Sequence, residues 1–195
     1  NITVVAAVGG DGTVNKVISA IIDINIPLLI IPIGSGNGLA RHLKIPLHLK
    51  HALDLLIHGK ISNIDTASVN SKVFACTSGV GFDAHIGRLF AKAKKRGLKT
   101  YVKITLKELF SYVPKEYKLT INSNTITTQA FLITIANANQ WGNDVQIAPD
   151  ADIQDGLLNI VILKPFKLHQ LPFIAIKIFT KKIHHSNYVS IHKAN

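Results

Sequence analysis

The sequence predicts an α/β unit with parallel strands, followed by a mainly antiparallel β domain. In the first 60 residues, buried-strand patterns, glycine-rich loops and helical patterns alternate, which is typical of parallel strands joined by crossover helices. After residue 60, short runs of β-forming residues predominate, and Asn-Ser pairs separate two pairs of these runs, as in antiparallel hairpins. We therefore divide the chain into residues 1–62 and 63–195.

The first part alternates between two residue patterns. Apolar residues fill residues 2–8 and 28–33 almost continuously, as in strands buried on both faces of a parallel sheet. From Val14 onward, apolar side chains instead repeat at helical spacing. The expected order is strand, loop, helix, strand, loop, helix and helix, over residues 2–8, 9–13, 14–22, 28–33, 34–38, 39–43 and 51–58.

The second part contains mostly strand patterns. The pairs Asn70-Ser71 and Asn122-Ser123 predict hairpin turns. Residues 83–95 and 102–112 have helical patterns, and residues 171–183 fit either a buried strand or an amphipathic helix. Strands are expected over residues 61–69, 72–77, 116–121, 125–135, 157–163 and 188–192.

Composition restricts the function classes. Lys and Arg outnumber Asp and Glu by 22 to 11, so the partner should be anionic: a nucleotide, an anionic lipid or a nucleic acid. No helix-turn-helix, zinc or RNA-binding signature is present, which argues against nucleic acid, and the histidines at 184, 185 and 192 are expected to lie on the surface. The single cysteine, Cys76, excludes an internal disulfide and is expected to be a small buried apolar residue in a cytoplasmic protein. No segment is long enough to span a bilayer and no signal-peptide pattern is found, while the strand-like start predicts that the chain begins inside a domain.

The loop Gly9-Gly10-Asp11-Gly12-Thr13 follows a buried strand and precedes a helix. Glycines let the backbone approach a ligand, and the free N–H groups and dipole of a helix N-terminus attract phosphate. Asp11 could act through a bound Mg²⁺ or orient an acceptor hydroxyl, and Thr13 could cap the helix or donate to a phosphate oxygen. The alternative is a tight turn in which Asp11 or Thr13 serves only as a helix cap.

The second loop, Gly34-Ser35-Gly36-Asn37-Gly38, repeats this arrangement. In a parallel sheet both loops emerge at the carboxyl edge, where ligands bind. Two such loops therefore predict a phosphate site, with Ser35, Gly36 and Asn37 as further candidates. Arg41 on the following helix either faces a phosphate or is solvated.

Four ordered segments resemble the family of diacylglycerol kinases and sphingosine kinases. The first loop, continued by Val14-Asn15, resembles the signature that these lipid kinases share with NAD kinases. The stretch from Ile31 to Arg41 resembles the lipid-kinase branch. Further matches to that branch are Gly81-Phe82-Asp83-Ala84 and Asp155-Gly156-Leu157-Leu158.

The resemblance implies an N-terminal α/β domain and a C-terminal β-sandwich domain, with the active site in the cleft between them. It implies transfer of the γ-phosphoryl group of ATP to a lipid hydroxyl. As the catalytic base, which the family's pattern does not supply here, our candidate is Asp11. It also implies Mg²⁺ near Asp152, Asp155 and Leu157, where this basic chain has its densest acidic cluster; solvated acids are the alternative. Nucleotide contacts are expected at Gly9, Gly10, Asp11, Gly12, Thr13, Val14, Asn15, Lys16, Ser35, Gly36 and Asn37.

The chain departs from the family pattern in three places. Lys16 stands where the family usually has Glu, the family's Asn-Pro loop is absent, and no Asp-Gly-Glu segment supplies the proposed general base. We therefore expect an apparently truncated lipid kinase acting on diacylglycerol, a sphingoid base or an isoprenoid alcohol. The alternatives are an inactive nucleotide- or lipid-binding module of the same family and, third, an NAD kinase.

A basic segment predicts a membrane contact. Its cationic side chains lie beside Phe90, Leu98 and Tyr101, which fits an anionic bilayer surface; a solvated charged face is the alternative. The expected partners are ATP, a lipid substrate, the membrane surface and a second copy of the chain. The cations are Lys92, Lys94, Lys95, Arg96, Lys99 and Lys103.

Overall fold

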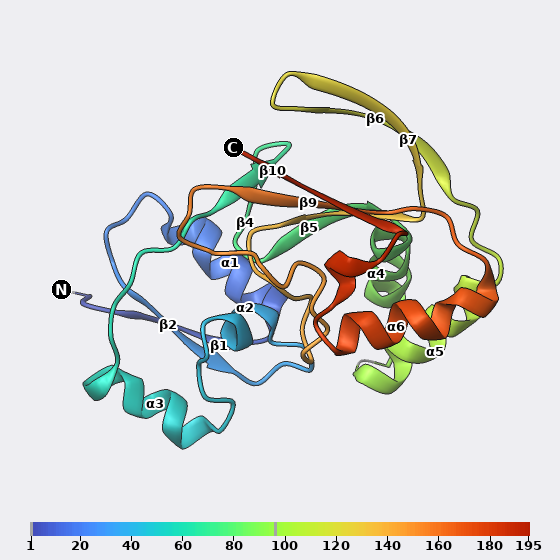
Figure 1. Cartoon of the computed structure of the whole chain (residues 1–195). Helices are drawn as coiled ribbons and strands as arrows, with labels where there is room; N and C mark the ends of the chain where they lie inside the picture. Colours follow the sequence, from blue (N-terminus) through green and yellow to red (C-terminus); the bar gives the residue numbers. More distant parts are fainter. Residues whose placement is uncertain (1, 96) are drawn as a thin grey trace.

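The computed structural model describes residues 2–95 and 97–195. A small α/β group lies beside a larger group built on an antiparallel sheet (Figure 1). The elements are β1 (Val5–Gly9), α1 (Asp11–Ile21), β2 (Leu28–Pro32), α2 (Gly38–His42), α3 (Leu49–His58), β3 (Ala67–Val69), β4 (Lys72–Phe74), β5 (Thr77–Gly81), α4 (Phe82–Lys92), α5 (Leu98–Leu109), β6 (Lys115–Ile121), β7 (Asn124–Ala130), β8 (Leu132–Ala136), β9 (Leu158–Leu163), η1 (Leu168–Gln170), α6 (Leu171–Phe179), η2 (Ile183–His185) and β10 (Val189–Ala194).

The α/β group confirms the predicted parallel pair. β1 and β2 pair in parallel, α1 packs on β1, and α3 packs on β2. Side chains of β2 alternate between the two helices: Ile30 joins the core that contains Val14, whereas Leu29 and Ile31 join Ala52 of α3. Both faces of the strand are therefore buried, which explains its uninterrupted apolar sequence.

The larger group is a sheet of order β10-β9-β8-β5 with antiparallel neighbours. The hairpin β6–β7 arches over one face (Figure 1), where Ile160 and Ile162 of β9 pack against its apolar residues. Alternate residues of β9, Val161 and Leu163, join cores on the other side. The two-residue period of a strand thus divides β9 between two cores.

Helices α4, α5 and α6 gather near one end of this sheet (Figure 1). Their buried side chains share one core, in which Ile86 of α4, Leu109 of α5 and Ile174 of α6 take part. Among the described residues, no helix combines the length and the apolar character needed to cross a bilayer.

Several element boundaries differ from expectation. α1 begins at Asp11 and not at Val14, because Gly10 already has the extended backbone of an N-cap and an acid in the first turn favours the helix dipole. The expected strand over residues 61–69 is reduced to β3, and before it the Asp65 N–H donates to the Ile153 carbonyl. The expected strand over residues 125–135 is two strands, since the chain passes at Phe131 from the hairpin to the main sheet.

Other expectations are confirmed. Asn70-Ser71 and Asn122-Ser123 are hairpin turns with left-handed backbone at both residues of each pair. Residues 171–179 form helix α6, which settles the choice between strand and helix. The division of the chain at residue 62 stays a prediction.

Side-chain amides join the two groups. Asn15 of α1 donates from Nδ2 to the Val73 carbonyl at 2.9 Å, and its Oδ1 accepts from the Ala75 N–H at 3.2 Å. Asn137, which is fully buried, donates from Nδ2 to the carbonyls of Asp65 and Ala75 at 2.7 and 2.8 Å. Asn15 thus ties α1 to β4 and to the residue that follows it, whereas Asn137 satisfies two carbonyls within the larger group.

Asn15→Ala should lower the free energy of unfolding by about 1–3 kcal/mol, because the Val73 carbonyl and the Ala75 N–H lose their partner in a partly buried place. The matched control is Ser19→Ala on the same helix, whose exposed hydroxyl donates to the Asn15 carbonyl; its effect should stay within about 0.5 kcal/mol. Urea unfolding measures both. An equal effect of the two substitutions would show that the Asn15 bridge does not stabilise the chain.

Candidate active site

The first glycine loop is shorter than its sequence implies. Gly10 ends the extended segment, and its carbonyl accepts from the N–H groups of Thr13 and Val14 at 2.9 and 3.0 Å. Asp11 and Gly12 are therefore the first residues of α1, where N–H groups have no acceptor within the helix. This end of α1 offers the donors and the dipole that a phosphate requires.

The two glycine loops touch through their backbones. A Cβ atom on Gly10 would lie 3.0 Å from the Gly34 Cα, and a Cβ atom on Gly34 would collide with the Gly10 Cα. Glycine is required at both positions by this close approach. The prediction that both loops emerge at the same edge of the parallel pair is confirmed.

The second loop is shaped by hydrogen bonds of its own. Asn37 has left-handed backbone, donates from Nδ2 to the Gly34 carbonyl at 2.8 Å, and accepts the Gly34 N–H on Oδ1 at 3.0 Å. Arg41 donates from Nε to the Gly36 carbonyl at 3.1 Å and pairs with Asp144 at 2.8 Å. Arg41 thus links the second loop to Asp144 of the larger group. The sequence had predicted that Arg41 would face a phosphate or be solvated, and it had not predicted this link.

A third loop, from the larger group, closes against the second. Gly142 has φ 125°, and a Cβ atom there would lie 2.8 Å from the Gly36 Cα. The Asn143 N–H donates to the Gly36 carbonyl at 3.0 Å, and Gly38 packs against the Trp141 backbone. The phosphate loops are therefore held by both parts of the chain.

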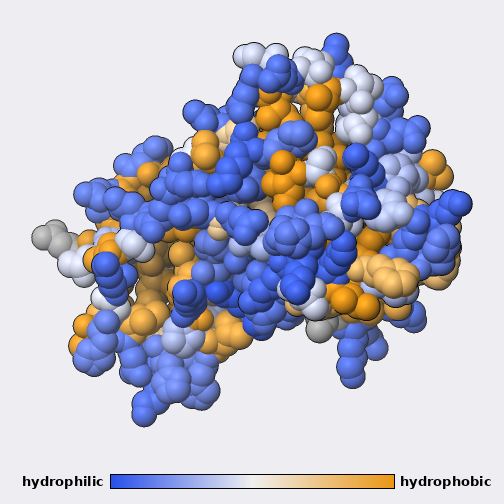
Figure 2. Space-filling view, viewed as in Figure 1, coloured by the Kyte–Doolittle hydropathy of each residue, from blue (hydrophilic) through white to orange (hydrophobic). Residues whose placement is uncertain are grey.

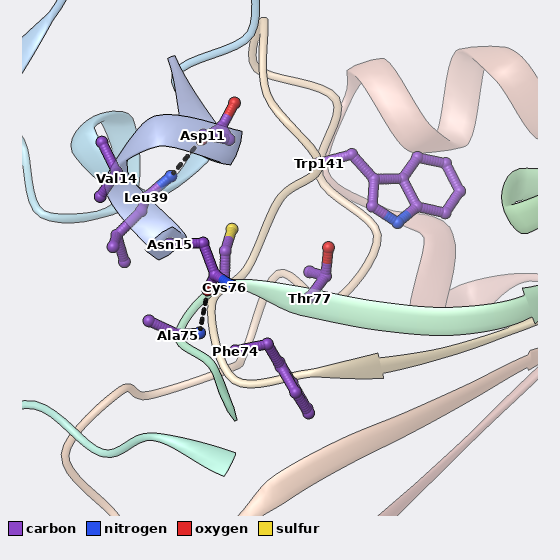
Figure 3. Close-up of a pocket in the computed structure, with 9 residues that line it drawn as sticks. All are labelled: Asp11, Val14, Asn15, Leu39, Phe74, Ala75, Cys76, Thr77 and Trp141. Carbon is purple, nitrogen blue, oxygen red and sulfur yellow. Dashed lines mark hydrogen bonds between the residues drawn. The ribbon is translucent and has the colours of Figure 1, made fainter. Parts of the chain in front are cut away.

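A pocket of about 140 Å³ lies between the two parts (Figure 3). At Cys76, burial and then the negative charge of Asp11 raise the thiol pKa to about 12, and Sγ donates to the Gln140 carbonyl at 3.3 Å. Cys76 is thus a neutral wall of the pocket, as expected for a small apolar residue. The pocket is small beside the roughly 300–1,000 Å³ of whole ligand sites, so it fits only part of a nucleotide. Its lining residues are Asp11, Val14, Asn15, Leu39, Phe74, Ala75, Cys76, Thr77 and Trp141.

Asp11 lies where the second loop meets the pocket. Its Oδ1 accepts the Leu39 N–H at 3.4 Å (Figure 3). Its Oδ2 would lie 3.0 Å from a Cβ atom on Gly36. The carboxylate therefore contacts the second loop while it lines the pocket. It is placed to hold an acceptor hydroxyl or a cation beside a bound phosphate.

The other predicted nucleotide contacts differ in exposure. Ser35 and Lys16 are exposed and open to a ligand. Thr13 is exposed and its side chain covers Gly9, whereas Val14 is buried in the core. Contact of each with a nucleotide stays a prediction.

Asp83 is an acid to which the sequence argument assigned no role. It is the second residue of α4, accepts the Ala84 N–H at 2.7 Å, and accepts the Thr134 hydroxyl at 3.3 Å. Burial raises its pKa to about 6. A Cβ atom on Gly79 would lie 2.7 Å from its Oδ2, and Gly79 is two strand residues, about 7 Å, from Thr77 in the pocket wall.

A raised carboxyl pKa near a pocket is typical of a functional acid or base. The available signal was positional: an acid at the start of a helix, directly after a strand rich in glycine. Burial against β8 raises the pKa and the Thr134 hydroxyl partly offsets this rise. Periodicity alone does not bring β8 together with residue 83.

The expected Mg²⁺ ligands lie on the loop before β9. The Asp155 carboxylate accepts from Lys193 Nζ at 3.0 Å and from the Leu157 N–H at 3.0 Å, and the Lys193 hydrogen bond lowers its pKa. Asp152 accepts the Gln154 N–H at 2.9 Å. Oxygen donors of this kind suit Mg²⁺, but a cation already neutralises Asp155, and no group of three or more His, Cys, Asp or Glu within residues 2–95 and 97–195 could hold a metal. The carboxylates as arranged do not form a Mg²⁺ site by themselves. The assignment of Mg²⁺ to Asp152, Asp155 and Leu157, partly through backbone carbonyls, stays a prediction.

Two family models match the chain in sequence order. One, described as the diacylglycerol kinase catalytic domain, matches residues 1–69. The other, described as the YegS C-terminal NAD kinase beta sandwich-like domain, matches residues 76–195.

Individual relatives agree with these matches. The chain is 32% identical over 185 residues to the "Probable lipid kinase YegS-like" of Yersinia enterocolitica, across 91% of this chain and 62% of that protein. It is 29% identical over 198 residues to the diacylglycerol kinase of Bacillus subtilis, across 98% of this chain and 65% of that protein. The chain spans about half the length of the curated relatives it matches, from 37% to 65% of each.

A solved structure shares the fold. The crystal structure of a diacylglycerol kinase from Bacillus anthracis superposes with a TM-score of 0.74 at 23% identity, over 100% of this chain and 64% of that one. This likeness confirms the predicted fold class, an α/β unit followed by a β-sandwich-like domain. Since one family model alone matches more than half of the residues and the other matches most of the remainder, the chain belongs to the family of diacylglycerol kinases and YegS-like lipid kinases.

Proposed function

We propose that this chain carries the nucleotide-phosphate site of a lipid kinase, which transfers the γ-phosphoryl group of ATP to a lipid hydroxyl. The observation that supports it most is the backbone contact between two glycine loops at the carboxyl edge of a parallel strand pair. That edge collects the free N–H groups of the first turn of α1, and it opens into a pocket shared by both parts of the chain.

In this reaction the acceptor oxygen attacks the γ-phosphorus, the bond to the bridging oxygen of ADP breaks, and the hydroxyl proton passes to a base. Asp11 orients the acceptor beside the phosphate loops. We assign the proton to Asp83, whose pKa of about 6 leaves it ionised near neutral pH and basic enough to accept. Asp83 lies beside Gly79 and not in the pocket lining, so the transfer from a hydroxyl in the pocket would pass through a water. This assignment supplies a base that does not depend on an Asp-Gly-Glu segment.

Two alternatives differ in one measurable step each. A non-catalytic nucleotide- or lipid-binding module would bind ATP without turnover, and Lys16 in place of the usual Glu favours it. An NAD kinase would phosphorylate NAD. The choice among diacylglycerol, a sphingoid base and an isoprenoid alcohol, the cytoplasmic location and the homodimer stay predictions.

Purified chain with Mg²⁺, γ-labelled ATP and mixed micelles of total lipid should yield a labelled lipid in the organic phase. Asp11→Asn keeps the size of the side chain but removes its charge, and should lower the rate by about 10²-fold or more. A parallel reaction with NAD in place of lipid tests the other acceptor, and label on NAD would support the NAD kinase instead. ATP binding without label on any acceptor would leave the binding module.

Gly34→Ala should abolish measurable ATP binding, because the added methyl group would push Gly34 away from Gly10 and separate the phosphate loops. The matched control is Gly87→Ala on α4, where a Cβ atom meets nothing within 4 Å. Calorimetric titration with a non-hydrolysable ATP analogue compares the two. Equal affinity in both variants would place the nucleotide elsewhere.

The rate should fall as the pH drops through about 6, because protonated Asp83 cannot accept the hydroxyl proton. Asp83→Asn should lower the rate by about 10²–10⁴-fold and remove this dependence. The range from pH 5 to pH 8 reaches about one unit or more on each side of this pKa. A rate for the native chain that stays constant over this range would contradict the assignment of Asp83 as the base.

Stability gives an independent reading of the same group. Because its pKa is raised, the folded state binds the Asp83 proton more tightly than the unfolded state, so this stabilisation is present below about pH 4 and lost as pH rises through about 6. The free energy of unfolding of Asp83→Asn is compared with that of the native chain at each pH. This difference should be about 2 kcal/mol more in favour of the variant at pH 8 than at pH 4.

A further inference from the structure

The excess positive charge of the chain is confined to two segments. Residues 84–113 contain eight Lys and Arg but one acid, Glu108, and residues 164–185 contain five Lys and no acid. The remaining residues carry nine Lys and Arg and ten Asp and Glu, so they are nearly neutral. The first segment includes α5 and α4 apart from its first two residues, Phe82 and Asp83, and the second segment includes α6. Arg96 and the side chain of Leu98 lie outside the described residues.

Helix α5, together with its C-cap residue Phe110, presents two parallel rows of exposed side chains. Val102, Leu106 and Phe110 recur every four residues and are 45%, 53% and 72% exposed. Lys103 and Lys107 recur at the same spacing one residue after the first two, and both are exposed. Since residues four apart share a helix face, the apolar row and the lysine row lie side by side. Glu108, the acid of this segment, points elsewhere and pairs with His85 at 2.8 Å.

Helix α6 also leaves an apolar face uncovered. Phe173, Ile176 and Phe179 are 68%, 59% and 65% exposed. Figure 2 shows apolar side chains gathered at the lower right, over α6. Because the buried faces of α5 and α6 pack into one core, both uncovered faces belong to the same end of the molecule.

We propose that α5 and α6 form a docking surface for an anionic lipid bilayer, in which the six apolar side chains enter the boundary of the acyl chains and the lysines lie at the head groups. Apolar rows flanked by lysine are the pattern of helices that lie in a membrane interface. A second copy of the chain is a poorer occupant, since a two-fold interface would set lysine rows against each other. This proposal extends the proposed function and rests on it, because a lipid kinase must reach an acceptor held in a bilayer.

The test is sedimentation of the full chain with vesicles of phosphatidylcholine, with and without phosphatidylglycerol, in the absence of ATP. Binding should require phosphatidylglycerol and weaken with salt. Lys103→Glu with Lys107→Glu should lower the partition coefficient at least about tenfold, and Leu106→Asn with Phe110→Ser should do the same. The matched controls lie on α3: Lys50→Glu replaces an exposed lysine, and Ile57→Asn replaces an isoleucine that is 81% exposed. Each control should change the partition coefficient less than about twofold.

Four results would overturn the surface. The native chain could fail to bind either kind of vesicle. The α5 variants could bind as well as the native chain, or the α3 controls could lose as much. A change in oligomeric state at unchanged vesicle binding would assign the face to a second copy. Phosphorylation of a short-chain, water-soluble acceptor is measured separately. If this acceptor is phosphorylated but the α5 variants bind vesicles normally, only the docking surface is wrong. If vesicles bind through α5 but no acceptor is phosphorylated, only the kinase proposal is wrong.

Discussion

The candidate site depends on one constraint, the backbone contact of three loops that come from distant parts of the chain. Gly10 meets Gly34, and Gly36 in turn meets Gly142, at distances that leave no room for a Cβ atom. Because backbone approaches this closely, the positions of the phosphate-facing N–H groups are set by main-chain packing and not by flexible side chains. The larger group therefore helps to shape the candidate site, even though within residues 2–95 and 97–195 no strand joins its sheet to β1 and β2.

A residue in such a site can stabilise the loop backbone and contact the ligand at the same time. Asn15 and Asn37 were expected to touch the nucleotide, and both use their amides to satisfy backbone groups of β4 and of the second loop. Replacing either would move the loops as well as remove a ligand contact. A loss of activity in these variants therefore needs a stability measurement beside it before it is read as a lost nucleotide contact.

The sequence predicted what local patterns determine. Periodicity found the parallel pair and most helices, and turn chemistry found both Asn-Ser hairpins. It failed where the outcome depends on distant partners: the run 125–135 is uniformly β-forming, and only pairing with β6 on one side and with β5 and β9 on the other divides it at Phe131. The same holds for the site, since the glycine loops are visible in the sequence while the raised pKa of Asp83 requires burial against β8.

Charge separates the two surfaces that a lipid kinase needs. Outside the α4–α5 and α6 segments, the basic and acidic residues nearly balance, and Arg41 beside the phosphate loops is already paired with Asp144. Nucleotide phosphate would then be held mainly by oriented N–H groups and a helix dipole, which act over short range. The long-range positive field belongs to the segments that carry α4, α5 and α6, where an extended anionic surface, and not a single small anion, can engage many lysines at once.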